Sequence, residues 1–224
     1  MDKGLIKPGR IKIVGSTRLL FVMAAEGEYG PCLRALCDPL MTGVGPVEAA
    51  ISVTRRLCDL AAAGQLPHLV VCLGSAGSAR LSQREVYQAS SVSWRDMDAS
   101  AVGFPKGETP FLGLPAELPL PHQIAGLPAA RLSTGANVIS GAGYEAIDAD
   151  MVDMETYAVL RACQHFGPGV IALRGISDGE ADLTAIEDWE RYLDAVDKAL
   201  ALACERLFVA VLNGDFGDHG LETP

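Results

Sequence analysis

Two carboxylates stand where an enzyme built on an α/β sheet would carry its chemistry. Glu155 lies in Val152-Asp153-Met154-Glu155-Thr156, which opens a predicted helix. Asp178 ends Arg174-Gly175-Ile176-Ser177-Asp178, directly after the apolar run at 169–173. Residues at such strand–helix junctions meet at one edge of the sheet, where ligands bind. Two facing carboxylates are also the minimal equipment for cleaving a glycosidic bond. The sequence therefore predicts an acid–base site around Glu155 and Asp178.

The elements that must position this pair follow from the spacing of apolar residues. Strands are expected at 10–14, 18–23, 67–73, 85–94, 130–139 (with its turn) and 169–173. Helices are expected from Pro46 to about Leu60, at 154–166 and at 186–212. A Pro- and Gly-rich loop at 103–121 separates strands of the same rhythm, and a polar tail covers about 213–224. This alternation predicts an α/β fold in one domain spanning 1–224.

The glycine-rich turns predict no nucleotide cofactor. Gly43-Val44-Gly45 lacks the third glycine of a dinucleotide fingerprint, and no P-loop sequence occurs. The small-residue stretch at 74–79 reads as a turn after a buried strand. Such a turn lets the backbone approach a ligand closely, although an ordinary tight turn would look the same. Four dispersed histidines lack metal-ligand spacing, so we expect neither a metal nor a cofactor.

Composition limits the partners of the chain. With 224 residues, 49% of them hydrophobic, the chain can bury a large core. A net charge of −10 argues against a nucleic-acid polymer as partner, because phosphate binding favours a basic face. No apolar run approaches a membrane span, and the first ten residues do not resemble a signal peptide. Six scattered cysteines without a CxxC motif indicate reduced thiols and a cytoplasmic protein. Cys58 lies in an apolar helix pattern and is expected to be a core residue.

Several short motifs occur in the order seen in one enzyme family. They are Ala24-Ala25-Glu26-Gly27-Glu28, Thr42-Gly43-Val44-Gly45, Gly74-Ser75-Ala76-Gly77, Asp96-Met97-Asp98-Ala99-Ser100-Ala101, Val152-Asp153-Met154-Glu155 and Arg174-Gly175-Ile176-Ser177-Asp178. In these motifs, over roughly residues 18 to 210, the chain resembles the nucleoside phosphorylase/nucleosidase superfamily, most of all its methylthioadenosine/S-adenosylhomocysteine nucleosidases. The resemblance implies a three-layer α/β fold whose twisted mixed sheet is partly barrel-like and flanked by helices, and it implies a homodimer.

The resemblance also assigns roles in cleaving a purine nucleoside. Glu28 would activate the attacking water, Glu155 would hold the ribose hydroxyls, and Asp178 would protonate N7 of the leaving adenine. Met154 would lie against the sugar and base. The remaining expected substrate-site residues are Ser75, Ala76, Ser177, Val138 and Trp189.

The chain departs from the family pattern at Val138, at Ala25 and at Gly27, which interrupts the usual acidic run. Val138 stands where the family usually has an aromatic residue that stacks on the purine, and Trp189 matches a second aromatic of the pocket. Ala25 replaces a larger residue, which favours a wider pocket. The resemblance implies a nucleoside substrate such as 5′-methylthioadenosine, S-adenosylhomocysteine or another 5′-substituted adenosine, and the departures favour an unusual 5′ group.

Each role has a structural alternative. Glu28 and Glu155 could serve helix N-termini, Asp178 could cap a turn, and Trp189 could anchor the core. Arg174 is expected to pair with a neighbouring acid rather than to bind substrate.

The attacking group separates a hydrolase from a phosphorylase of the same fold. A phosphorylase needs arginines for its dianionic substrate. The loop at 24–28 carries acids instead, and no arginine directly precedes Gly74. Water is therefore the expected acceptor. Two alternatives stay open: a phosphorylase, and a nucleoside-binding protein with weak catalysis.

Overall fold

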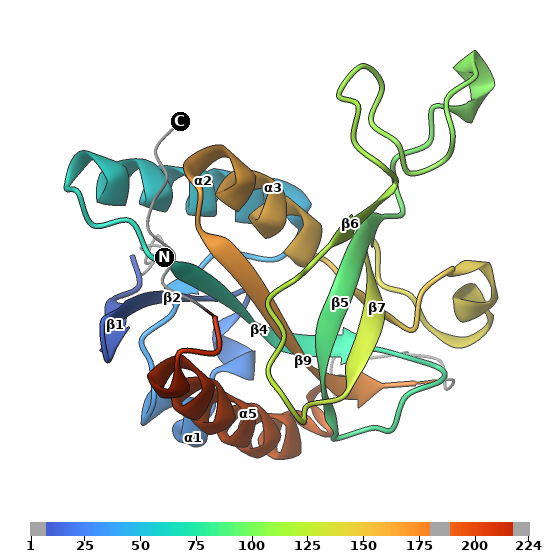
Figure 1. Ribbon diagram of the computed structural model, residues 1–224. Coiled ribbons are helices and arrows are strands. Elements are labelled where there is room, and N and C mark those ends of the chain that lie inside the picture. Colours follow the sequence, from blue (N-terminus) through green and yellow to red (C-terminus); the bar gives the residue numbers. More distant parts are fainter. Residues whose placement is uncertain (1–7, 180–188, 217–224) are drawn as a thin grey trace, which may run out of the picture.

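The computed structural model describes residues 8–179 and 189–216 and has three layers (Figure 1). Its strands are β1 Ile11–Val14, β2 Thr17–Met23, β3 Leu40–Met41, β4 Leu69–Gly77, β5 Val86–Trp94, β6 Glu117–Pro119, β7 Ala129–Thr134, β8 Met151–Asp153 and β9 Gly169–Asp178. Its α-helices are α1 Pro31–Arg34, α2 Pro46–Ala62, α3 Thr156–Phe166 and α5 Leu193–Asn213, and short 3-10 helices are η1 Glu26–Glu28, η2 Ser100–Val102 and η3 Gly141–Ala146.

Within the described residues, all strands belong to one mixed sheet that closes partly on itself. β4 pairs with β9 in parallel, β9 with β5 antiparallel, β5 with β7 in parallel, β7 with β8 in parallel, and β8 returns to β4 through the pair Val152–Gly77. These five strands form a ring, while β2, β1 and β3 extend the sheet beyond β4. The expected partly barrel-like mixed sheet is confirmed.

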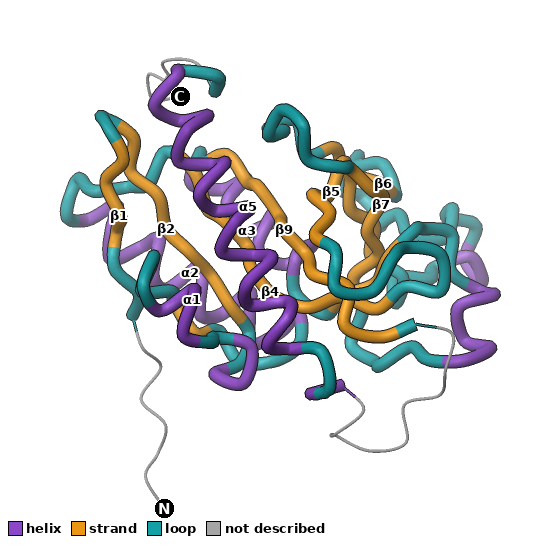
Figure 2. The backbone as a smooth tube through the Cα atoms, turned by 90° about the horizontal axis from the view of Figure 1, so that it is seen from below, coloured by secondary structure: helices purple, strands orange, loops and turns teal. Residues whose placement is uncertain are grey.

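The helices cover the two faces of the extended sheet. α2 and α3 lie together on one face, and α5 with α1 lies on the other, as Figures 1 and 2 show. Along β2, Leu20 and Val22 belong to the cluster under α2 and α3, whereas Leu19, Phe21 and Met23 belong to the cluster under α5. A strand buried on both faces reads as a continuous apolar run, which is why these strands could be recognised.

Two central strands run further than the sequence indicated. β4 continues to Gly77 and β9 to Asp178, so 74–77 is strand rather than the expected turn. The small residues there make room for side chains. A Cβ atom at Gly74 would lie 2.5 Å from Arg174 Nη1 and 3.2 Å from Glu28 Oε1. Small residues are typical of turns, so the sequence pattern at 74–79 indicated a turn although these residues only make room for neighbouring side chains.

Two further expectations need correction, and a third is not tested. The loop expected at 103–121 contains β6, which pairs antiparallel with β5. Cys58 is exposed on α2 rather than part of the core, because the buried face of this helix runs through Ala49, Val53 and Leu57. The start expected for the last helix, at 186, lies outside the described residues, as does most of the polar tail.

Other expectations agree with the structure. α3 ends at Phe166 and is followed by Gly167, which adopts a left-handed conformation with a φ of 102° before Pro168. All six cysteines are free thiols. No described helix is both long enough and apolar enough to cross a membrane.

Candidate active site

A cavity of about 540 Å³ lies at the end of the strand ring where β4, β8 and β9 finish. It is lined by Ala24, Ala25, Glu28, Val44, Ser75, Ala76, Gly77, Arg95, Asn137, Val138, Ile139, Val152, Asp153, Met154, Glu155, Asp178 and Trp189. Of the site residues expected from the sequence, only Ser177 lies outside this lining. Ala24 and Trp189, which are 165 positions apart in the chain, therefore meet at this end of the ring.

Glu28 ends the 3-10 helix η1 and is buried, so it is not an exposed helix acid. Its Oε1 atom accepts hydrogen bonds from the Ser75 backbone N–H at 2.7 Å and from the Ser75 hydroxyl at 2.6 Å. The indole N–H of Trp189 in turn donates to Ser75 Oγ at 3.0 Å. Because both Ser75 bonds converge on one oxygen and a carboxylate offers about four acceptor positions, Glu28 can still receive a bond from a water molecule.

Behind Glu28, Asp197 of α5 fixes the short helix that follows. Its carboxylate is buried and accepts hydrogen bonds from the backbone N–H groups of Cys32 at 2.9 Å and Leu33 at 3.0 Å. These are orphan donors at the start of α1. Trp189 therefore contacts Ser75 from just before α5, and Asp197 of α5 fixes the segment that follows Glu28.

Glu155 is the N-cap residue of α3, but its side chain makes no capping hydrogen bond to that helix. Its Oε1 atom accepts a hydrogen bond of 2.9 Å from the backbone N–H of Gly45. Gly45 precedes Pro46 at the start of α2 and has a φ of 98°, a conformation that favours glycine. Burial raises the pKa of Glu155 to about 7; the charge of Asp153 adds to the rise and Arg174 opposes it.

Asp153 is the acid of this cluster whose bonding is most complete. Its carboxylate accepts hydrogen bonds from the Thr134 hydroxyl at 2.5 Å, from the Thr156 N–H at 2.9 Å and from the Thr156 hydroxyl at 2.5 Å. It also pairs with Arg174, whose Nη2 lies 2.5 Å away, while Glu155 is 4.0 Å from the same nitrogen. As expected, Arg174 serves a neighbouring acid. Buried charges require such pairing.

Asp178 ends β9 and is buried, with a donor for each carboxylate oxygen. The Ser177 hydroxyl lies 2.7 Å from Oδ1, and the Tyr144 hydroxyl donates to Oδ2 at 2.9 Å. Ser177 therefore contacts Asp178 from behind the cavity wall instead of lining the cavity. Tyr144 comes from η3 and was not expected from the sequence.

Arg95 follows β5 and is held by backbone carbonyl groups. Its Nη1 donates to Ser133 O at 2.6 Å and to Asp153 O at 2.9 Å, and its Nη2 donates to Asn137 O at 2.6 Å. Burial lowers the pKa of this guanidinium, although nearby acids oppose the change. The contact with Asn137 fixes the loop that carries Val138, whose side chain is 66% exposed at the cavity rim.

Three residues of the site were missed by sequence reasoning. Asp153 stood inside a recognised motif, but its bonding depends on the distant Thr134. Arg95 adjoins another motif, where only the fold shows that its side chain reaches the cavity. Tyr144 carried no signal, because its contact with Asp178 spans 34 positions.

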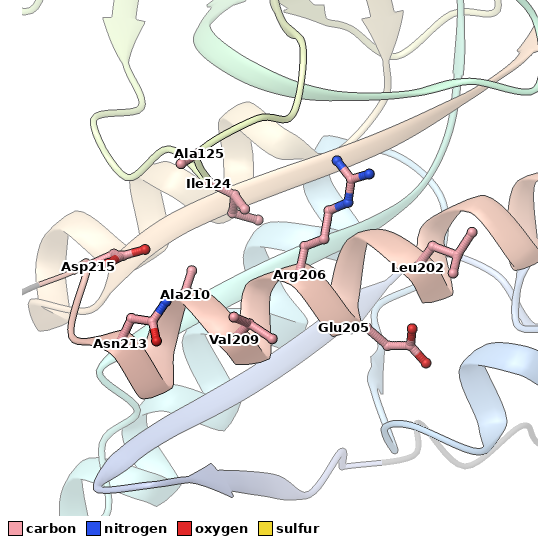
Figure 3. Close-up of a pocket in the computed structure, with 9 residues that line it drawn as sticks. All are labelled: Ile124, Ala125, Leu202, Glu205, Arg206, Val209, Ala210, Asn213 and Asp215. Atoms are coloured by element: carbon pink, nitrogen blue, oxygen red, sulfur yellow. The ribbon is translucent and has the colours of Figure 1, made fainter.

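A second cavity, also of about 540 Å³, runs along α5 beside Ile124 and Ala125 (Figure 3). Its charged lining residues are Glu205, Arg206 and Asp215. None of the expected site residues lies there, and its acids are not held by convergent donors as Glu28 and Asp178 are. The candidate active site is therefore the cavity at the end of the ring. No described cluster of His, Cys, Asp or Glu side chains could hold a metal ion.

Besides Asp153, which is paired with Arg174, three carboxylates with different surroundings line the same cavity. Glu28 can accept a further hydrogen bond, and Asp178 is fixed by two hydroxyl groups. Glu155 is buried, which raises its pKa to about 7. Such a set can deprotonate a water molecule, bind hydroxyl groups and pass a proton to a leaving group. Splitting a bond between a sugar and a base needs these three operations.

Comparison with known proteins points to one family. The model of the phosphorylase superfamily matches residues 132–212. The 5′-methylthioadenosine/S-adenosylhomocysteine nucleosidase of Actinobacillus succinogenes is 30% identical over 167 residues, which cover 65% of this chain and 70% of the relative.

Solved structures share the fold at low identity. Futalosine hydrolase of Helicobacter pylori has a TM-score of 0.71 and 19% identity, covering 85% of this chain and 96% of its own. The 5′-methylthioadenosine/S-adenosylhomocysteine nucleosidase of Neisseria meningitidis, in complex with methylthio-immucillin-A, has a TM-score of 0.70 and 18% identity, covering 85% and 98%.

Proposed function

This chain belongs to the phosphorylase/nucleosidase superfamily as a nucleosidase-type enzyme, and we propose that it hydrolyses the N-glycosidic bond of a 5′-substituted adenosine. The proposed substrates are 5′-methylthioadenosine and S-adenosylhomocysteine, named in the relative from Actinobacillus succinogenes. The products are free adenine and the corresponding 5′-substituted ribose.

Glu28 activates the attacking water in this proposal. Ser75 presents its N–H and hydroxyl to one carboxylate oxygen, which fixes the direction of the carboxylate. Water gives up a proton to Glu28 as its oxygen bonds to C1 of the ribose.

Glu155 grips the ribose hydroxyls, and its negative charge favours the positive charge that develops on the sugar ring. The Gly45 N–H holds this carboxylate in place. Met154 beside it lies against the sugar.

Asp178 supplies the proton that lets the base leave. It donates to N7 of adenine as the electrons of the glycosidic bond move to the base. Ala76, Val138 and Trp189 form the apolar walls around the nucleoside. Because Val138 is aliphatic and lies at the exposed rim, Trp189 is the residue that stacks on the base.

Hydrolysis is favoured over phosphorolysis because Arg95 and Arg174, the arginines in and next to the cavity, already have partners within the protein. Arg174 is paired with Asp153, and Arg95 donates to backbone carbonyl groups. A phosphate dianion entering beside Glu28 and Glu155 would meet two carboxylates and no uncommitted guanidinium in the described lining. Water is neutral and needs no such partner.

Futalosine is a second candidate substrate. The fold is shared with futalosine hydrolase of Helicobacter pylori, and the exposed rim at Val138 leaves space beside the base or the 5′ group. The same three carboxylates would act on its glycosidic bond.

A panel of nucleosides tests the proposal. Purified protein is incubated with 5′-methylthioadenosine, S-adenosylhomocysteine, futalosine, adenosine and inosine, with and without phosphate, and the free base is measured by chromatography. We expect adenine from the first two without phosphate. Strict phosphate dependence would indicate a phosphorylase. A rise in Tm with no base released would indicate a binding protein.

Asp178→Asn tests the assignment of the acid within the same panel. We expect base release from purine substrates to fall at least a hundredfold, as for loss of a general acid. Asp59→Asn, which changes an exposed acid on α2, is the matched control and should keep full activity. Near-normal turnover by Asp178→Asn would remove Asp178 as the acid.

We also propose that the enzyme assembles as a homodimer. Val47 and Ile51 expose apolar side chains one helical turn apart on α2, and Val44 extends this stripe to the cavity. Light scattering after gel filtration should give twice the mass of the 224-residue chain. A monomer at micromolar concentration would contradict the proposal.

A further inference from the structure

Tyr144 is a buried side chain that contacts the proposed acid without lining the cavity. It is the only buried residue of η3, and its hydroxyl donates to Asp178 Oδ2 at 2.9 Å. Among the described residues that line the cavity, Asp178 is present and Tyr144 is not. The hydroxyl therefore binds the carboxylate from outside the cavity wall and leaves room for a substrate on the other side.

The direction of this hydrogen bond is fixed by chemistry. Burial raises the pKa of the Tyr144 hydroxyl, and the charge of Asp178 raises it further, so the hydroxyl keeps its proton. A protonated phenol next to a carboxylate oxygen donates. Ser177 lies beside the other oxygen at 2.7 Å. Asp178 is thus placed between two hydroxyl donors.

The backbone leaves space for this contact at Gly77. This glycine is the last residue of β4 and pairs with Asp178 of β9. A Cβ atom at position 77 would lie 2.5 Å from Asp178 Oδ2 and would also collide with the Tyr144 hydroxyl. The absence of a side chain at Gly77 is therefore a condition for Tyr144 and Asp178 to meet.

We propose that Tyr144 is a positioning residue for the general acid, holding Asp178 and stabilising the carboxylate that remains after its proton has moved to the leaving base. This inference rests on the proposed function. In the step concerned, the O–H bond of Asp178 breaks and a bond from the proton to N7 of the base forms. The electron pair of the glycosidic bond goes to the base, and the negative charge remains on Asp178.

The effect of Tyr144 should appear in the transition state and not in substrate binding. Hydrogen bonds to a charged acceptor are about twice as strong as those between neutral groups. The bond from Tyr144 therefore strengthens as Asp178 loses its proton. An interaction that strengthens only along the reaction raises kcat and leaves KM unchanged.

Tyr144→Phe tests this role, because it removes the hydroxyl and keeps the ring. With 5′-methylthioadenosine, we expect kcat to fall about ten- to a hundredfold, the effect of one hydrogen bond to a charged group. KM should stay within about twofold of wild type. Tyr87→Phe, which loses a hydroxyl near Ser82 away from the site, is the matched control and should retain wild-type kcat.

A second substrate separates positioning of the acid from a general structural role. 4-Nitrophenyl β-D-ribofuranoside has a leaving group that departs without a proton. Tyr144→Phe should cleave this substrate at a rate within about twofold of wild type. Asp178→Asn should show a still larger difference between its loss of activity with the purine nucleoside and its loss with the nitrophenyl riboside. An equal loss with both substrates would overturn the inference, because it would mean that the cavity as a whole is disturbed.

The pH profile with the purine substrate gives an independent readout. A carboxylic acid that has lost one donor to its anionic form holds its proton to higher pH. The alkaline limb of the kcat profile of Tyr144→Phe should therefore move to higher pH. An unmoved limb with unchanged kcat would show that the contact plays no part in the reaction. If the wild-type protein releases no base from any purine nucleoside, the proposed function itself fails, which is a distinct outcome.

Discussion

Replacement of Glu155 by glutamine should stabilise the protein while removing its activity. Glu155 is 7% exposed, and its pKa is raised from 4.5 to about 7, first by burial and then by Asp153. In the unfolded chain the same group ionises near 4.5. Between these two values the native state binds more protons than the unfolded state, so stability is lost as the pH rises through this range.

The magnitude follows from the gap between the two pKa values. At 1.36 kcal/mol per pH unit, ionised Glu155 lowers the free energy of unfolding by about 3 kcal/mol at pH 8. At pH 4.5, where Glu155 is protonated in the native state, the same linkage costs less than about 1 kcal/mol. Glutamine is neutral at both values and can still accept the hydrogen bond from Gly45 through its amide oxygen. The Tm of Glu155→Gln should rise by roughly 6–12 °C at pH 8.

Urea denaturation of both proteins at pH 8 and pH 4.5 checks this prediction. Glu205→Gln removes the same charge from an exposed position on α5 and should change stability by less than about 0.5 kcal/mol at either pH. A gain of the same size at both pH values would refute the reasoning, because it could not come from ionisation. Base release by Glu155→Gln should be lost, since the neutral amide cannot favour a developing positive charge.

Two further contacts give separate predictions. Trp189→Phe keeps an aromatic ring in the cavity but removes the N–H bonded to Ser75, so kcat should fall several-fold, with KM within about twofold in steady-state assays. Asp197→Ala leaves the N–H groups of Cys32 and Leu33 buried without their acceptor. It should lower the free energy of unfolding in urea by about 2–4 kcal/mol, and an unchanged midpoint would show that this link between α5 and α1 does not contribute to stability.

The parts of the fold that could be read from the sequence are those with a strong local pattern. Strands such as β2 are apolar on both faces and stand out as continuous runs, and α3 is closed by Gly167 and Pro168. The end of β4 could not be recognised, because Gly74 and Gly77 are small to make room for side chains from β9, η1 and η3. That requirement exists only once the strands are paired.

The candidate site divides in the same way. Glu155 and Asp178 were found because each lies at the end of an apolar run or the start of a helix, where α/β enzymes place functional groups. The partner of Arg174 could be expected to be an acid, but its identity as Asp153 became clear only from the fold, which brings the end of β8 next to the Arg174 side chain of β9. Tyr144 could not be found, since a lone tyrosine in an irregular segment has no periodic or motif signal.

In the proposed reaction, water and not phosphate attacks the ribose. The direct measurement is phosphorus-31 NMR of the reaction with 5′-methylthioadenosine in phosphate buffer, combined with an assay for reducing sugar. We expect one reducing sugar for each adenine released, no new phosphate-ester signal, and the same rate when phosphate is left out. A 5-methylthioribose 1-phosphate signal that grows with adenine would contradict attack by water.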